Sequence, residues 1–207
     1  MIRKKDDSGF TLIELMISTT VFSVVLLIAT ISIILISKNY TRGQVTIQTQ
    51  NTVQSILNNI SNAIKYNNLS TLNFSNLSTA TNRYFCIGNN VYYFNNLNQL
   101  LGSNSSAVGL VEYTSPSCNR PTSVPSGASQ LLSNNERLGQ LSITDIGTTS
   151  HLYQIDIEVA YGNDSVLTTL NPAGPPPYKY RCNDSYLSTS FCSIDSETVT
   201  VSPRLMN

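Results

Sequence analysis

The longest apolar stretch of the chain lies near its N-terminus, in residues 10–37. It contains 28 residues, and Glu14 is its single charged residue. About 20 predominantly apolar residues are enough for a helix to cross a bilayer. The pattern therefore predicts a membrane-spanning helix with residues to spare.

A second helical pattern follows in residues 38–65. Its apolar residues recur at spacings of three and four, which is typical of one face of an amphipathic helix. We expect this face to pack against the globular part of the same chain. Gly43 and the β-branched, Gln-rich stretch 44–52 are weaker helix formers, which leaves a local bend near Gly43 open. The apolar face consists of Val53, Ile56, Leu57, Ile60 and Ile64.

The pattern changes again after a polar connector, residues 66–80, which is rich in turn-forming residues. Residues 83–87 and 91–94 flank the turn 88–90 and predict a β-hairpin. From Tyr153 to Val159, apolar and polar residues alternate, as in a strand with one face exposed to solvent. Further strands are predicted at 97–101, 108–113, 140–144, 152–160 and 198–201, and loops at 115–129 and 171–177.

The order of these elements predicts the α+β class. One long N-terminal helix, with a membrane-embedded half and an amphipathic half, would pack against an antiparallel β-sheet head. We find no internal repeat in the sequence.

Composition and charge narrow the function. The chain has 207 residues with 12 Lys+Arg and 12 Asp+Glu, so its formal net charge is zero. Nucleic-acid binders usually carry a basic footprint, so no nucleic-acid partner is expected. Only 12% of residues are charged and roughly a third are Asn, Ser or Thr, which suits a surface outside the cell.

The N-terminal flank predicts the orientation in a membrane. Arg3, Lys4 and Lys5 precede the apolar run, and basic residues on a short flank keep that end cytoplasmic. An ordinary secretory signal peptide has a shorter apolar stretch followed by a small-residue cleavage site. Here the small residue, Gly9, precedes the apolar run, so cleavage after it would leave the helix on the mature protein.

Glu14 is the most informative residue of the apolar run, because a carboxylate inside a membrane helix is costly. Cleavage after Gly9 would create an α-amine on Phe10, which is a cation at neutral pH. At about 4 Å and an effective dielectric constant near 20, this amine and Glu14 would attract by roughly 4 kcal/mol. The pair can form within one chain or between neighbouring chains. In the alternative, Glu14 reaches the cytoplasmic headgroups without a specific partner.

The segment from Gly9 to Leu15 reads GFTLIEL. With the short basic leader and the apolar run, it resembles the class III leader of type IV pilins and type II secretion pseudopilins. The resemblance implies that a prepilin peptidase cuts after Gly9 and that Phe10 is N-methylated. It also implies that Glu14 compensates the N-terminal charge of an adjacent subunit. Many major pilins have helix-breaking Pro and Gly in the membrane helix, whereas this run has neither.

The resemblance implies a domain layout and a set of partners. Residues 1–9 form a cleaved leader, 10–37 the transmembrane and filament-core helix, 38–65 its amphipathic continuation, and 66–207 the exported head. The implied partners are other pilin or pseudopilin subunits, the prepilin peptidase, an inner-membrane assembly platform and the cell membrane. The N-terminus would be cytoplasmic and the head periplasmic or extracellular. No cofactor is implied.

Four cysteines, an even number, lie on the side predicted to be exported, where disulfides form. Three pairings are possible. Cys182 and Cys192 are separated by ten positions, so a local pair between them is favoured, which leaves Cys86 with Cys118. Four free thiols are the alternative, and the absence of a C-x2–4-C pair argues against zinc.

Three other candidate sites are weaker. His151, the only histidine, precedes the best strand and is expected at a strand edge rather than in a catalytic centre. The tyrosine-rich stretch 84–93 could stack on the bases of single-stranded nucleic acid. The sequence offers no basic groove to support such binding. Calcium binding is an open alternative, although the 12-residue loop pattern of many calcium sites is absent from the sequence. The calcium candidates are Asp156, Glu158, Asp164 and Asp184.

The sequence thus predicts a non-enzymatic filament subunit, with a minor component of the J or W type favoured within the class. The main alternative is a single-pass anchored binding protein or adhesin that does not polymerise. An anchored extracellular hydrolase would need a nucleophile and base pair that the sequence does not offer.

Overall fold

The computed structural model describes residues 10–75, 77, 83–94, 109–119, 121, 125–133, 135–147, 151–163, 165–169, 180–183 and 191–204. The expected leader, the predicted strand 97–101 and the predicted loop 171–177 lie outside these residues. The chain divides into two compact units, Met1–Tyr40 and Thr41–Asn207.

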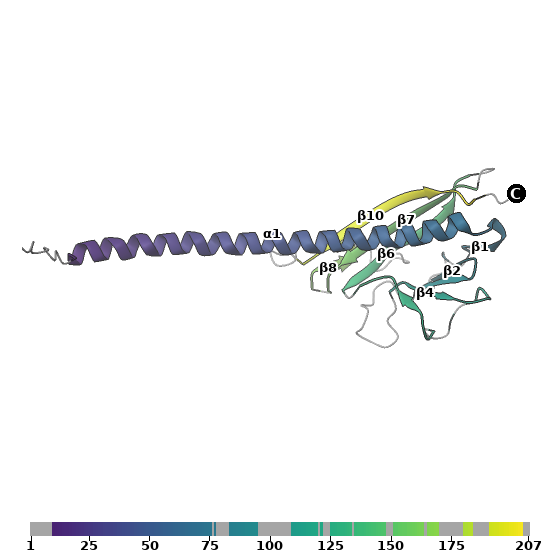
Figure 1. Ribbon diagram of the computed structural model, residues 1–207, viewed down its shortest axis with the longest axis horizontal. Helices are drawn as coiled ribbons and strands as arrows, with labels where there is room; N and C mark the ends of the chain where they lie inside the picture. Colours follow the sequence, from purple (N-terminus) through teal and green to yellow (C-terminus); the bar gives the residue numbers. More distant parts are fainter. Residues whose placement is uncertain are drawn as a thin grey trace, which may run out of the picture. The chain divides into compact units, whose positions relative to one another are not determined.

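A single helix, α1 (Leu12–Tyr66), contains 55 residues and contributes to both units (Figure 1). The helical hydrogen bonding continues through Gly43, so this glycine does not break the helix. The C-terminal end of α1 is closed by two hydrogen bonds. The side-chain amide of Asn67 donates to the carbonyl of Ala63 at 2.8 Å, and the backbone N–H of Arg204 donates to that of Lys65 at 3.1 Å. These donors satisfy carbonyls that a helix end leaves without an intrahelical partner.

The second unit buries the predicted apolar face of α1. All five residues of that face are at most 3% exposed. They belong to one hydrophobic cluster with side chains from two β-sheets, so the core lies between the helix and the sheets. The prediction that this face packs on the head of the same chain is confirmed.

The first sheet has five antiparallel strands in chain order. The predicted hairpin is confirmed as β2 (Arg83–Ile87) and β3 (Asn90–Phe94), with Gly88 in the turn at φ 62°. In this hairpin Phe85 and Tyr92 face the core with their rings stacked 4.7 Å apart. The other strands of the sheet are β1 (Leu72–Asn73), β4 (Val111–Thr114) and β5 (Ser129–Gln130).

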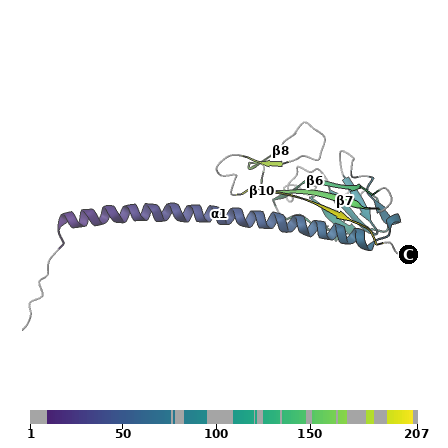
Figure 2. The ribbon, with the colours of Figure 1, turned by 90° about the horizontal axis from the view of Figure 1, so that it is seen from above.

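The second sheet is a three-stranded antiparallel layer in the order β10-β7-β6, and Figure 2 shows it along the second part of α1. The central strand is β7 (Tyr153–Tyr161), and its buried residues alternate with half-buried ones as the sequence predicted. Both outer strands, β6 (Glu136–Asp145) and β10 (Ser193–Val201), pair along its whole length.

Several predicted boundaries were wrong. The outer strands begin at Glu136 and Ser193, four and five residues before the predicted 140 and 198, because the central strand offers them a continuous row of partners. Val111, not residue 108, begins β4. The connector 66–80 contains a 3-10 turn (Leu69–Thr71) as well as β1, and β5 begins at the last residue of the predicted loop 115–129.

A third, two-stranded sheet was not predicted from the sequence. It consists of β8 (Leu167–Thr169) and β9 (Tyr180–Cys182), which pair antiparallel. Each strand has only three residues, which is too short for an alternating pattern to show. The α+β class with a long N-terminal helix and antiparallel sheets is confirmed.

Candidate functional site

The segment that carries the sequence motif begins just before α1. Phe10 and Thr11 lie outside the helix, and the Phe10 side chain is 79% exposed. The Thr11 carbonyl accepts hydrogen bonds from the backbone N–H groups of Glu14 (3.1 Å) and Leu15 (3.2 Å). Thr11 Oγ1 accepts a further one from the Glu14 N–H at 3.3 Å. Thr11 is therefore the N-cap of α1, and the chain leaves the helix directly at Phe10.

Glu14 occupies the third position of the helix. Thr11 and Glu14 thus have the T-x-x-E spacing of a capping box. A carboxylate in the first turn is also favoured by the positive end of the helix dipole. The Glu14 side chain is exposed in the single chain, so it is accessible to a cation from another molecule.

The first unit presents an apolar surface. Within residues 10–36, the exposed large apolar residues have 49–79% of their surface accessible. By length and composition α1 can cross a membrane, and none of its most apolar 18-residue window is buried inside the protein. This surface needs lipid or other apolar helices to cover it.

The hydroxyl groups in this apolar segment are satisfied within the helix. Six Ser and Thr side chains each donate to a carbonyl three or four residues earlier, at 2.8–3.0 Å. Such bonds satisfy these six hydroxyl donors within the helix, as a hydrocarbon environment requires. The residues are Ser18, Thr19, Thr20, Ser23, Thr30 and Ser32.

Gly9 and the basic leader lie outside the described residues. The expected scissile bond between Gly9 and Phe10 is thus described only on its Phe10 side.

All four cysteines are paired. Cys86 bonds to Cys118 and Cys182 bonds to Cys192, with Cα–Cα distances of 5.9 and 5.8 Å. These are the pairs that the sequence spacing favoured. The first bond joins β2 to the chain after β4, and the second joins β9 to the start of β10.

The expected calcium candidates do not form a cluster in the described residues. Asp156 and Glu158 lie on β7, whereas Asp164 and Asp184 lie outside those residues. Partial burial alone raises the pKa of Asp156, but hydrogen bonds from Thr198, Gln154 and Ser142 lower it below its ordinary value. Within the described residues, no group of three or more His, Cys, Asp or Glu is placed to hold a metal ion.

His151 and the tyrosines have structural surroundings. His151 lies just before β7, half-exposed, with Nδ1 3.9 Å from an Asp145 carboxylate oxygen. Of the tyrosine-rich stretch, Tyr92 is fully buried in the core and Tyr93 is 6% exposed. Neither of these two rings is available as a broad stacking surface.

Glu136, which was not among the predicted site residues, is a fully buried carboxylate at the start of β6. Its Oε1 accepts a hydrogen bond from Thr52 Oγ1 on α1 at 2.9 Å, and its Oε2 accepts one from the Ser133 N–H at 2.7 Å. Burial raises the pKa of Glu136, and the hydrogen bonds from Ser133 and Thr52 oppose that shift. No periodic pattern marks such a residue, because its partners are distant in sequence.

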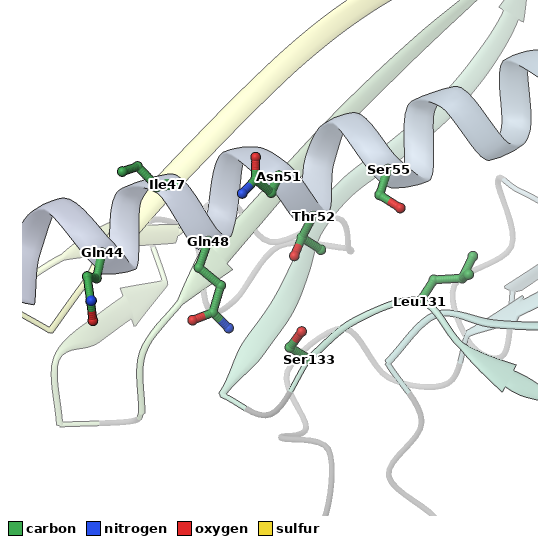
Figure 3. A pocket seen from close by; sticks show the side chains of 8 residues that line it. All are labelled: Gln44, Ile47, Gln48, Asn51, Thr52, Ser55, Leu131 and Ser133. Carbon is green, nitrogen blue, oxygen red and sulfur yellow. The ribbon is translucent and has the colours of Figure 1, made fainter.

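An open groove of about 650 Å³ runs beside this carboxylate, between α1 and the segment 131–133. Figure 3 shows Gln48 and Thr52 extending from the helix on the side of Ser133. The groove is lined by Gln44, Ile47, Gln48, Asn51, Thr52, Ser55, Leu131 and Ser133.

Comparison with known proteins assigns the N-terminal segment. Residues 4–30 match the family model described as the prokaryotic N-terminal methylation motif. The matched region contains Gly9, Phe10, Thr11 and Glu14. No curated protein and no solved structure matches the chain.

The match and the apolar helix confirm the resemblance found in the sequence. The N-terminal segment carries a methylation motif that supports the type IV pilin and pseudopilin class, a class of structural subunits. The class implies membrane anchoring, processing by prepilin peptidase and association with other pilin subunits.

Proposed function

We propose that this protein is a subunit of a type IV pilus or of a type II secretion pseudopilus, with a role in assembly rather than catalysis. The proposal is carried by one observation. The methylation motif stands at the start of an exposed apolar helix whose only charge over residues 10–37 is Glu14.

Processing after Gly9 would give Phe10 a free amine, which is then N-methylated. Because Thr11 caps the helix, Phe10 lies outside α1 with its side chain exposed, so a peptidase can reach it. In the filament Glu14 pairs with the Phe10 amine of a neighbouring subunit. An attraction of roughly 4 kcal/mol at about 4 Å offsets much of the cost of placing the carboxylate among apolar helices.

Before assembly, residues 10–37 span the cell membrane with the N-terminus in the cytoplasm. Residues 38–65 continue the helix outside the membrane, and residues 66–207 complete the exported head. An assembly platform in the inner membrane then moves the subunit from the bilayer into the fibre. The apolar side chains that lipid covers in the membrane are covered by neighbouring helices in the filament.

Within the class, we propose a minor component of the J or W type. The absence of Pro and Gly from residues 10–37 and the position of two cysteines late in the chain support this assignment. Immunogold labelling of sheared fibres tests it. Sparse or tip-only labelling is the expected result, and continuous labelling along the fibre would instead identify a major subunit.

Mass spectrometry of the mature N-terminus tests the processing. The expected product lacks residues 1–9 and carries one methyl group on Phe10. A native protein that still begins with Met1 would refute pilin-type maturation and favour the anchored binding protein that does not polymerise.

Substitution of Glu14 tests the assembly step. Glu14→Ala and Glu14→Gln should leave membrane insertion intact and reduce the amount of subunit in sheared filaments. Glu14→Asp keeps the charge on a side chain that is one methylene shorter. This variant should retain part of the incorporation into filaments. Equal incorporation of all three variants would refute the charge pairing while leaving the processing result valid.

A further inference from the structure

We infer that the groove between α1 and residues 131–133 binds an extended, uncharged segment from the head of a neighbouring filament subunit. This inference rests on the proposed function and names the kind of contact that the head makes in the filament. We call this site the α1 groove, lined by the eight residues given above.

The chemistry of the lining selects the occupant. None of the eight described lining residues is charged or aromatic. Small-molecule pockets are usually lined by hydrophobic and aromatic side chains, and bases of single-stranded nucleic acid stack on aromatic rings. Carboxamides and hydroxyls, by contrast, can donate to and accept from a peptide backbone. An uncharged polypeptide therefore fits this groove best.

The spacing of the polar side chains fits an extended backbone. Gln44, Gln48, Asn51 and Ser55 follow one another along the groove at intervals of four, three and four residues. Four residues of helix rise about 6 Å. Two residues of an extended chain advance about 6.6 Å, and after two residues the backbone N–H and C=O groups point in the same direction again. Successive side chains of the helix can therefore meet successive peptide groups of one bound strand.

The groove is held in shape before any partner arrives. Thr52 lines it from the helix and Ser133 from the facing segment, and both donate hydrogen bonds to Glu136. The two walls are thus fixed to one buried carboxylate. A preformed site loses less conformational entropy on binding than a flexible one.

The partner's composition and the position of the groove point to another subunit. A head like that of this chain, with few charges and many Asn, Ser and Thr residues, offers uncharged extended segments. Gln44 follows the apolar segment by seven residues in the sequence, since Ser37 ends that segment. Where the apolar segments of neighbouring subunits pack together, the residues that directly follow them in the sequence come within reach of those neighbours.

Photocross-linking in cells that assemble filaments tests the inference. A benzophenone amino acid is placed at Gln48 or Ser55 in the groove, and at Gln50 as a control. Gln50 is an exposed residue of the same helix that does not line the groove. After irradiation, the cross-linked peptides from sheared filaments are identified by mass spectrometry.

The expected cross-links have a defined spacing along the bound segment. Gln48 and Ser55 should cross-link to one uncharged segment of a subunit that carries its own N-terminal methylation motif. Seven helical residues rise about 10.5 Å, so the two attachment points should lie about three residues apart. The probe at Gln50 should not reach that segment. Cross-links to unrelated segments, to a protein without the motif, or to none at all would overturn the inference.

A pair of matched charge variants gives a second readout. Gln48→Glu introduces a charge into the groove with little change of shape, and Gln50→Glu introduces the same charge outside it. Because burying an unpaired charge at an interface is costly, we expect about tenfold less Gln48→Glu protein in sheared filaments and no loss for Gln50→Glu. Equal incorporation would contradict the inference. Absence of the unmodified protein from filaments would refute the proposed function as well.

Discussion

Thr52 on α1 donates a hydrogen bond from its hydroxyl to Glu136 at the start of β6, over 2.9 Å and 84 positions of sequence. Glu136 is fully buried, and its second oxygen is held by the Ser133 N–H. A buried carboxylate is costly unless its oxygens are satisfied. This contact therefore joins the helix to the three-stranded sheet through a group whose charge state matters for stability.

Glu136→Gln should make the stability of the head less dependent on pH. Burial raises the pKa of Glu136 in the folded state above its ordinary value near 4.5. Between the two pKa values the folded state binds more protons than the unfolded state, so stability falls as pH rises through this window. Glutamine keeps an acceptor oxygen for Thr52 or Ser133 and cannot ionise, so this fall should disappear.

Denaturation of the full-length protein in detergent by guanidinium chloride, repeated from pH 4 to pH 8, measures this effect. Tyrosine fluorescence is a suitable signal because the chain has 11 tyrosines and no tryptophan. Glu197→Gln, which changes a partly exposed carboxylate on β10, is the control and should keep the dependence of the wild type. An unchanged pH profile for Glu136→Gln would contradict the role assigned to burial.

Tyr92→Phe should destabilise the head although it removes only one oxygen atom. The Tyr92 hydroxyl lies 2.6 Å from Asn59 Oδ1 on α1 and 3.3 Å from Glu112 Oε1 on β4. Burial, and then the charge of Glu112, raises the pKa of Tyr92, so the hydroxyl stays protonated as a donor. Its loss leaves two half-buried acceptors without this donor, at a cost of about 1 kcal/mol.

Thermal unfolding compares Tyr92→Phe with Tyr66→Phe, whose ring is 65% exposed. For a chain of this size, each 1 kcal/mol corresponds to roughly 2–4 °C in Tm. We expect a lower Tm for Tyr92→Phe and almost no change for Tyr66→Phe. Equal Tm values for the two variants would show that the hydroxyl network does not stabilise the head.

The elements that sequence alone predicted share one property, a periodic pattern long enough to read. The five apolar residues of the amphipathic part of α1 and the alternation in β7 each repeat several times. The motif around Glu14 was recognisable because local spacing carries its chemistry. Such features depend on neighbours in sequence, so a single chain contains the information.

The features that were missed depend on distant partners. Strands β1 and β5 have two residues each and exist only because β2 and β4 supply hydrogen-bond partners. Glu136 reads as an ordinary polar residue after a turn, although it is buried against Thr52 from a helix 84 positions earlier. The α1 groove likewise brings together residues near 48 and near 132. Tertiary pairing determines these features, and no local pattern reports it.

Ile60→Ala should weaken the contact between α1 and both sheets. Ile60 is fully buried at the centre of the apolar face. Truncation of such a side chain typically costs about 2–5 kcal/mol, because the transfer free energy is lost and a cavity remains. Asn58→Ala, an exposed change on the same helix, should stay within about 0.5 kcal/mol. Chemical denaturation of both variants gives the comparison, and equal stabilities would contradict the packing role.

The two disulfides should differ in their contribution to stability because they close loops of different length. The Cys86–Cys118 bond spans 32 positions and the Cys182–Cys192 bond spans 10. The chain-entropy relation gives about 3.7 kcal/mol for the longer loop and about 2.7 kcal/mol for the shorter one. We therefore expect the double variant Cys86→Ser/Cys118→Ser to be less stable than Cys182→Ser/Cys192→Ser.

Denaturation of both double variants in the same detergent measures the difference, which should be about 1 kcal/mol. Replacing both members of a pair avoids a free thiol that could form a wrong disulfide. If the Cys182→Ser/Cys192→Ser variant is instead the less stable, loop entropy does not decide the order. The shorter bond would then act mainly by holding β9 beside the start of β10, where Cys192 is buried against Tyr180 and Leu167.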